Sequence, residues 1–362
     1  YIFVVSKLKM IVKLHYYKNL TGVRAIAALL VMFLHFFNQL NIDTETLIFF
    51  FNFSKIGQTG VTLFFVLSGF LITRILINTK NHKNYFKNFY FRRTLRIFPL
   101  YYLFLILYYY VFPSILNTSE TFTSQPYYFS YLQNFALTFQ WSVNDGPGHF
   151  WSLAVEEHFY LIWPLVVFLN PQKSLKRLIY VIIISALTLR FIISFYGYEI
   201  MWLTFTRMDS LAIGGLLAFW EMDKRISKNS NLFVYGILIF SFLTFATSLL
   251  LKDEQFRDTF HSLKYTFWSF GFFCCIGYVL SINKQHFINK MLCSKFLEYT
   301  GKISYGLYVY HLFAFTLIRH HFSFNSWIIQ MIVSFAFTYF ISAISYHFFE
   351  VFFLKLKGYF NE

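Results

Sequence analysis

The chain alternates long apolar runs with short polar segments. Ten runs of roughly 20 residues recur along its 362 residues, and a helix of that length crosses the hydrocarbon core of a bilayer. The pattern therefore predicts an all-α fold, a polytopic membrane helix bundle with about ten transmembrane helices. The spans are expected at 21–40, 57–78, 96–113, 150–169, 177–196, 205–221, 232–251, 264–281, 302–320 and 326–350.

The basic residues predict how this bundle is oriented. The chain has 31 Lys and Arg against 16 Asp and Glu, a formal net charge of +15. With the N-terminus in the cytoplasm, 22 of the 31 basic residues fall in inside segments and 5 in outside segments, as the positive-inside rule requires. Both termini are therefore expected in the cytoplasm, and the charge indicates topology rather than nucleic-acid binding. The domains expected are a cytoplasmic N-terminal segment (1–18), a transmembrane domain (19–350) and a cytoplasmic tail (351–362).

Composition narrows the class of protein further. The chain is 57% hydrophobic and 24% aromatic, with only 13% charged residues, which excludes a disordered chain and argues against a soluble globular enzyme. Its three cysteines (Cys274, Cys275 and Cys293) show neither a disulfide framework nor a zinc spacing. No metal site is predicted.

Ionisable side chains inside the spans are costly and are candidates for function. The first span, TGVRAIAALLVMFLHFF, carries Arg24 and His35 eleven residues apart. Eleven residues extend about 16 Å along an α-helix and bring the second side chain to nearly the same face as the first. The alternative to a functional role is that the Arg24 side chain snorkels to the membrane interface and that His35 is a hydrogen-bonded structural residue.

The third span opens with three arginines in FRRTLRIFPLYY. Arg93 and Arg96 share a helix face, with Arg92 beside them. These residues could be plain orientation signals. Planar guanidinium groups also suit phosphate recognition, so the alternative is a nucleotide-like anion that arrives from the cytoplasm.

The fourth span begins WSLAVEEHFYLIWP, with Glu156, Glu157 and His158 adjacent. Adjacent helical residues point in different directions, so the three are not expected to face one site together. At least one carboxylate should face the interior, where it could pair with an arginine or hold His35 in one tautomer. Trp151 could be an interfacial anchor or pack within the bundle.

Three other spans contain polar candidates. Small residues such as Ser68 and Gly69 usually mark helix packing, and lining a narrow tunnel is the functional alternative. His311, in the ninth span, could handle protons or be structural. The remaining candidates are Arg207 and Asp209 at the outer end of the sixth span and Ser304 and Tyr305 near the cytoplasmic end of the ninth.

Taken together, these segments resemble the acyltransferase-3 family of integral membrane acyltransferases, which O-acylate surface sugars. The matching segments are NLTGVRAIAALLVMFLHFF, QTGVTLFFVLSGFLIT, RRTLRIFPLYY, WSLAVEEHFYLIWPL, RMDSLAIGGLLA and GKISYGLYVYHLF, in the family's order over residues 19–350. The resemblance implies that His35 is the catalytic base and that Arg93 and Arg96 serve an acyl-CoA donor. The proline that usually follows the last-helix glutamate is replaced here by Val351.

The resemblance and the residues together predict a membrane O-acyltransferase. It would move an acyl group, expected to be acetyl, from cytoplasmic acyl-CoA to a hydroxyl of a cell-surface or lipid-linked glycan, from within the plasma membrane and with no permanently bound cofactor. The alternative is a transporter or flippase of lipid-linked glycan that uses the buried ionisable residues as a proton relay. The residues expected in catalysis are His35, Arg24, Glu156 and Glu157. Those expected at the donor are Arg92, Arg93, Arg96, Ser68, Gly69, Ser304 and Tyr305, and those expected at the acceptor are Arg207, Asp209, Trp151 and His311.

Overall fold

The computed structural model describes the chain except for residues 1–15, 42–43, 117–121, 142–144, 251–253 and 361–362. Most of the predicted N-terminal segment, with Lys7, Lys9 and Lys13, therefore lies outside the described residues, as does Lys252. All regular secondary structure in the described part is helical and none of it is a strand, which confirms the all-α prediction.

Each of the ten expected spans corresponds to one long helix. These are α1 (Lys18–Phe37), α3 (Gln58–Thr79), α4 (Tyr85–Tyr110), α8 (Trp151–Leu169), α9 (Gln172–Phe195), α10 (Thr204–Met222), α11 (Ser230–Leu250), α12 (Glu254–Ser281), α15 (Ser304–His321) and α16 (Trp327–Ile344). Short helices connect or extend them: α2 (Glu45–Ser54), α5 (Phe112–Leu116), α6 (Gln125–Phe129), α7 (Gln133–Thr138), α13 (Phe287–Leu292), α14 (Lys295–Lys302) and α17 (Val351–Leu356).

Seven segments of the described chain are long and apolar enough to cross a membrane, and they include α1, α3, α8, α9, α11, α12 and α16. The helices α4, α10 and α15 are outside this set because charged and tyrosine side chains lower their hydropathy. The structure thus supports a multi-pass membrane protein, while the count of ten and the orientation of the termini stay predictions.

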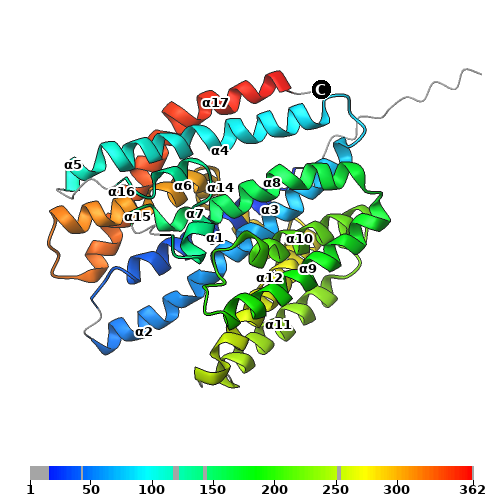
Figure 1. Cartoon of the computed structure of the whole chain (residues 1–362), viewed down its shortest axis with the longest axis horizontal. Coiled ribbons are helices and arrows are strands. Elements are labelled where there is room, and N and C mark those ends of the chain that lie inside the picture. Colours follow the sequence, from blue (N-terminus) through cyan, green and yellow to red (C-terminus); the bar gives the residue numbers. More distant parts are fainter. Residues whose placement is uncertain (1–15, 42–43, 117–121, 142–144, 251–253, 361–362) are drawn as a thin grey trace, which may run out of the picture.

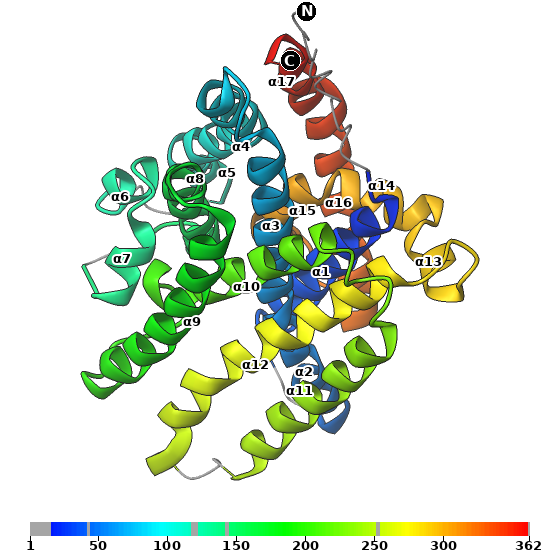
Figure 2. The ribbon, with the colours of Figure 1, turned by 90° about the vertical axis from the view of Figure 1, so that its right-hand side faces the viewer.

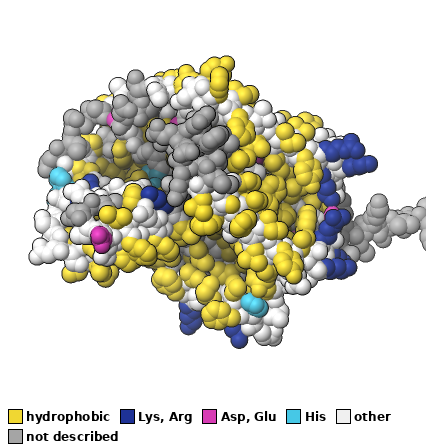
Figure 3. Space-filling model, turned by 90° about the horizontal axis from the view of Figure 1, so that it is seen from below, with side chains coloured by type: hydrophobic (Ala, Val, Ile, Leu, Met, Phe, Trp, Pro, Cys, Tyr) yellow, Lys and Arg dark blue, Asp and Glu magenta, His cyan; other side chains and the backbone are white. Residues whose placement is uncertain are grey.

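The bundle has a buried centre and an apolar exterior. Figures 1 and 2 show α9–α12 gathered on one side, with α4 and α17 along the opposite side. Large exposed hydrophobic residues are frequent on α9, α11 and α16, as on helices that face lipid. In Figure 3, hydrophobic side chains cover much of the visible surface, and Lys and Arg gather mainly at its right-hand edge.

Two kinds of contact fix the central helices. The helices α3 and α10 pack with their backbones close together, because Gly69 lies against the carbonyl of Leu211 and Gly214 against that of Val66. The helices α9 and α10 are joined by an ion pair between Arg190 and Asp209, 2.8 Å apart and both with fully buried side chains.

Residues 351–360, expected as a cytoplasmic tail, continue the last long helix. A π-helical segment, Ser345–Glu350, links α16 to α17, and a 3₁₀ turn follows at Lys357–Phe360. This segment packs along α4, where the rings of Phe91 and Phe360 stack with centroids 4.7 Å apart. It therefore lies beside the helix that carries the three adjacent arginines.

Candidate active site

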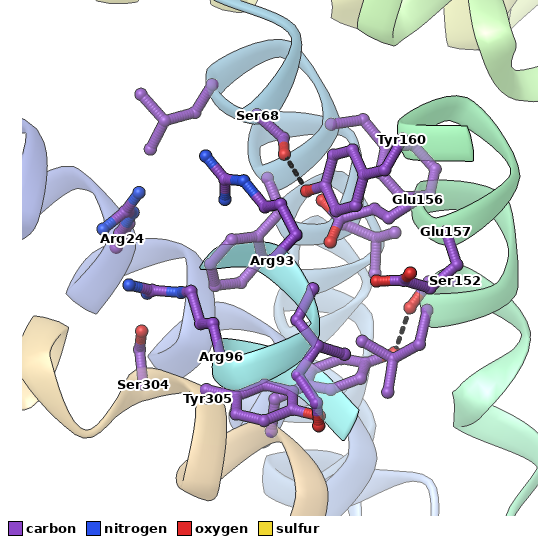
Figure 4. Close-up of a pocket in the computed structure, with 17 residues that line it drawn as sticks. Arg24, Ser68, Arg93, Arg96, Ser152, Glu156, Glu157, Tyr160, Ser304 and Tyr305 are labelled. Atoms are coloured by element: carbon purple, nitrogen blue, oxygen red, sulfur yellow. Dashed lines mark hydrogen bonds between the residues drawn. The ribbon is translucent and has the colours of Figure 1, made fainter. Parts of the chain in front are cut away.

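A cavity opens between α1, α3, α4, α8 and α15. Its volume is about 110 Å³. Figure 4 shows its lining side chains. The polar ones are Arg24, Ser68, Arg93, Arg96, Ser152, Glu156, Glu157, Tyr160, Ser304, Tyr305 and Tyr308. Eight residues predicted for catalysis or the donor, Ser304 and Tyr305 among them, are thus brought to one place.

Three guanidinium groups occupy one side of this cavity. Arg93 and Arg96 extend from α4 toward Arg24 of α1. In the described part of the chain, none of the three forms an ion pair with a carboxylate. Guanidinium groups that converge without a direct ion pair favour an anionic ligand beside them. Arg92, by contrast, is exposed and is not among the cavity residues.

The helix α8 supplies the opposite side. Glu156 and Glu157 both line the cavity (Figure 4), although adjacent residues were expected to diverge. His158 does point in a different direction, away from the cavity, and its Nδ1 is hydrogen-bonded to the hydroxyl of Thr204 at 2.7 Å. One oxygen of Glu157 is buried without a hydrogen-bond partner, so this carboxyl group has capacity to accept a bond from a ligand.

Hydroxyl groups complete the lining. Ser68 is hydrogen-bonded to Tyr160, and the ring of Tyr160 lies 5.4 Å from the Arg93 guanidinium. Tyr305 donates a hydrogen bond of 2.8 Å to the carbonyl of Ile97 on α4, which ties α15 to the arginine helix. Because these bonds hold the side chains in place, the cavity is preformed.

His35 does not line the cavity but belongs to a neighbouring cluster of three imidazoles. Its Nδ1 lies 2.7 Å from Nε2 of His311 on α15. The ring of His149 is 5.0 Å from that of His311 and 6.5 Å from that of His35. We call His35, His149 and His311 the imidazole cluster. Tyr308 joins it to the cavity, since this tyrosine lines the cavity and donates a 2.5 Å hydrogen bond to the carbonyl of His149.

Sequence reasoning missed four of these residues, His149, Ser152, Tyr160 and Tyr308. His149 precedes the fourth span and falls in a predicted outer loop, so its depth in the bundle was not foreseen. The signals that could have found Ser152 and Tyr308 are their helical spacings: Ser152 is four residues before Glu156, and Tyr308 is three before His311. The hydroxyl groups of Ser152 and Tyr308 are 2.5 Å apart.

Besides Arg92, His35 and His311, four predicted residues lie outside the cavity. Gly69 packs against α10, so the packing interpretation holds for it. Trp151 is buried against Phe65. Arg207, 1% exposed, donates to Thr62 at 2.8 Å and lies 3.9 Å from the Tyr265 ring centre.

Asp209 is the fourth of these residues, and it is occupied by its pair with Arg190. Among the described residues, no three His, Cys, Asp or Glu side chains are placed so that they could hold a metal ion.

Comparison with known proteins places these residues in context. The model of the acyltransferase-3 family, an acyltransferase domain, matches residues 17–347. The chain is 31% identical over 371 aligned residues to "Peptidoglycan O-acetyltransferase OatA" of Listeria monocytogenes, which covers 92% of this chain and 55% of that protein. It is 32% identical over 327 residues to "Putative peptidoglycan O-acetyltransferase YrhL" of Bacillus subtilis, covering 82% and 48%.

A third relative is "O-acetyltransferase OatA" of Staphylococcus aureus. It is 30% identical over 281 residues, covering 70% of this chain and 45% of that protein. The chain thus spans about half the length of the curated relatives it matches. No solved structure matches it.

Proposed function

The chain belongs to the acyltransferase-3 family, and from that premise we propose that it is a membrane O-acetyltransferase that acts on a cell-wall glycan. The observation that carries the proposal is the cavity in which Arg24, Arg93 and Arg96 converge without a direct ion pair to a carboxylate among the described residues. A donor that combines several phosphates with a reactive thioester fits this arrangement. Acetyl-CoA is such a donor.

The phosphates of acetyl-CoA dock on the guanidinium groups, with Arg93 and Arg96 as the principal contacts. Both lie in the first half of α4, which the distribution of basic residues assigns to the cytoplasmic side. Planar guanidinium groups bind phosphate oxygens through paired hydrogen bonds. The rest of the donor extends through the cavity toward Ser152 and Tyr308, behind which the imidazole cluster lies.

His35 then acts as the general base. It takes the proton from an acceptor hydroxyl while the oxygen attacks the thioester carbonyl, and it returns the proton to the departing thiolate. An acyl-histidine formed first on His35 is compatible with the same geometry. The acceptor is proposed as peptidoglycan, because two of the three relatives have peptidoglycan in their names. The protein would then reside in the plasma membrane.

The test is acetyl transfer by membranes that contain the full chain. Membranes are given radiolabelled acetyl-CoA, and label is measured in isolated peptidoglycan. The double variant Arg93→Ala/Arg96→Ala should raise the KM for acetyl-CoA by at least about 10- to 150-fold, since a hydrogen bond to a charged group contributes about 1.5–3 kcal/mol. Arg92→Ala is the matched control, because Arg92 has the same charge but does not line the cavity.

Two results would overturn the proposal. The first is that wild-type membranes transfer no label to peptidoglycan, which would rule out peptidoglycan as the acceptor or acetyl-CoA as the donor. The second is that the double variant has the wild-type KM, which would rule out Arg93 and Arg96 as the phosphate site. His35→Ala should abolish transfer in a protein that still inserts and elutes as a single species.

A further inference from the structure

The hydrogen bonds of the imidazole cluster have a defined direction. Nδ1 of His311 lies 2.7 Å from the carbonyl oxygen of Tyr308, one turn earlier in α15. A carbonyl oxygen only accepts hydrogen bonds, so Nδ1 of His311 carries a proton. If the ring is neutral, its other nitrogen, Nε2, is then an acceptor.

Burial argues that the ring is neutral. His311 is 0% exposed and forms no ion pair with a carboxylate in the part of the chain that the structure describes. An imidazolium enclosed in this way would lose its hydration without a compensating charge, which costs several kcal/mol. Nε2 of His311 is therefore a hydrogen-bond acceptor.

The same reasoning passes to His35. Its Nδ1 lies 2.7 Å from Nε2 of His311, with the two rings stacked at 18°, and must donate the proton of this bond. The remaining nitrogen of His35, Nε2, keeps its lone pair. We infer that His311 is a positioning residue that holds His35 in the tautomer whose Nε2 takes the proton from the acceptor hydroxyl. This inference rests on the proposed function.

The sequence suggested a glutamate for this task, and the structure assigns it to a histidine instead. Glu156 and Glu157 line the arginine cavity, whereas the partner of His35 is His311. The other groups at the cluster are Tyr308 and His149. Nε2 of His149 is 3.3 Å from the carbonyl of Val309 and so donates, while its Nδ1 is buried without a partner.

In the transfer step the bonds balance as follows. The hydroxyl O–H bond breaks and its proton binds Nε2 of His35, as the oxygen forms a bond to the thioester carbon. The C–S bond then breaks, and the thiolate takes the proton back from Nε2. In between, His35 is an imidazolium, and its Nδ1–H bond to His311 becomes charge-assisted and stronger. His311 therefore stabilises the charged intermediate more than the resting state.

Two amide substitutions separate this role from a purely structural one. The amide of His311→Asn sits near the position of Nδ1 and can keep the bond to Tyr308, but it is too short to reach His35. The amide of His311→Gln extends to the position of Nε2 and offers His35 an acceptor oxygen. The His311→Asn protein should lose about 10- to 150-fold in kcat, the worth of one charge-assisted bond, with the KM for acetyl-CoA unchanged. His311→Gln should recover most of that loss.

The experiment measures kcat and KM for acetyl-CoA in membranes with the full chain, alongside His35→Ala and wild type. Equal kcat for His311→Asn and wild type would overturn the inference, and so would an equal loss in both amide variants. Size-exclusion profiles in detergent show whether each variant is folded, and if His311→Asn is misfolded, a His311→Gln kcat far below wild type in a folded protein refutes the role. If the proposed function itself were wrong, the wild-type protein would transfer no acetyl group, so this outcome is distinguishable from a failure of the inference about His311.

Discussion

The buried pair between Arg190 and Asp209 allows a quantitative prediction. Asp209 accepts hydrogen bonds from Arg190 at 2.8 Å, from the hydroxyl of Thr266 at 3.1 Å and from the backbone N–H of Ser210 at 2.9 Å. Both side chains of the pair are 0% exposed. Asp209→Asn keeps the shape of the side chain but removes the charge, so Arg190 is left buried without a counterion.

The cost follows from that isolation. Removing one partner of a buried ion pair destabilises a protein by about 3–5 kcal/mol, which lowers the ratio of folded to unfolded protein by about 150- to 5,000-fold. The double variant Arg190→Met/Asp209→Leu replaces both charges by apolar side chains of similar size. It should recover most of the lost stability, because no uncompensated charge remains.

The assay is unfolding in mixed micelles titrated with SDS, followed by fluorescence of the seven tryptophans. The matched control is Asp223→Asn, since Asp223 pairs with Lys176 at 2.9 Å but both side chains are 36% exposed. That control should change the free energy of unfolding by no more than about 1 kcal/mol.

One result would refute the reasoning. If Asp209→Asn had wild-type stability and instead raised the KM for the glycan acceptor, Asp209 would be an acceptor ligand, as its position at the outer end of the sixth span first suggested. A double variant no more stable than the single one would also contradict the argument from charge isolation.

Two further predictions concern packing and pH. Gly69→Ala should destabilise the protein by about 1–3 kcal/mol without changing the KM for acetyl-CoA, because an added Cβ would collide with the Leu211 carbonyl. The control in the same SDS titration is Gly148→Ala, whose Cβ would meet nothing within 4 Å. A raised KM with normal stability would show that Gly69 belongs to the donor site after all. Hydrogen bonds from Lys18 and Lys302 hold the pKa of Glu298 down at about 2. A lowered carboxyl pKa contributes stability above its ordinary value of about 4.3, and this contribution disappears as the pH falls toward 2. Glu298→Gln should therefore lower the thermal midpoint slightly and equally at pH 6 and pH 8, with a difference that shrinks below pH 4; a difference that grows on acidification would show that the sign is wrong.

The sequence predicted the helices well because apolar length is a local property. Each of the ten expected spans has its helix, and most boundaries differ by a few residues. The largest differences are at α4 and α12, which begin at Tyr85 and Glu254 rather than at 96 and 264; in α4 the polar first half belongs to the same helix as the apolar second half. Arg93 and Arg96 could be placed on one face from their spacing alone. Arg92 could not be separated from them by charge, and only its direction on the helix excludes it from the cavity.

The cluster around His35 could not be predicted in the same way. His35 and His311 are 276 positions apart, and helical periodicity says nothing about which face meets which across that distance. His149 could not be predicted for another reason. It lies in the short turn before α8, and the sequence pattern assigns a polar residue outside an apolar run to a loop. Tertiary packing brings both rings to His35.

The helix α1 has a consequence for how the length of this chain can vary. Arg24 lines the cavity and His35 belongs to the imidazole cluster, and both come from one uninterrupted helix. The distance between the two side chains is therefore fixed by the helix. Deleting one residue between them would move His35 by about 1.5 Å and turn it about 100° away. Substitutions along this stretch can be absorbed by neighbouring side chains, whereas an insertion or deletion would break the register between the proposed donor site and the proposed base.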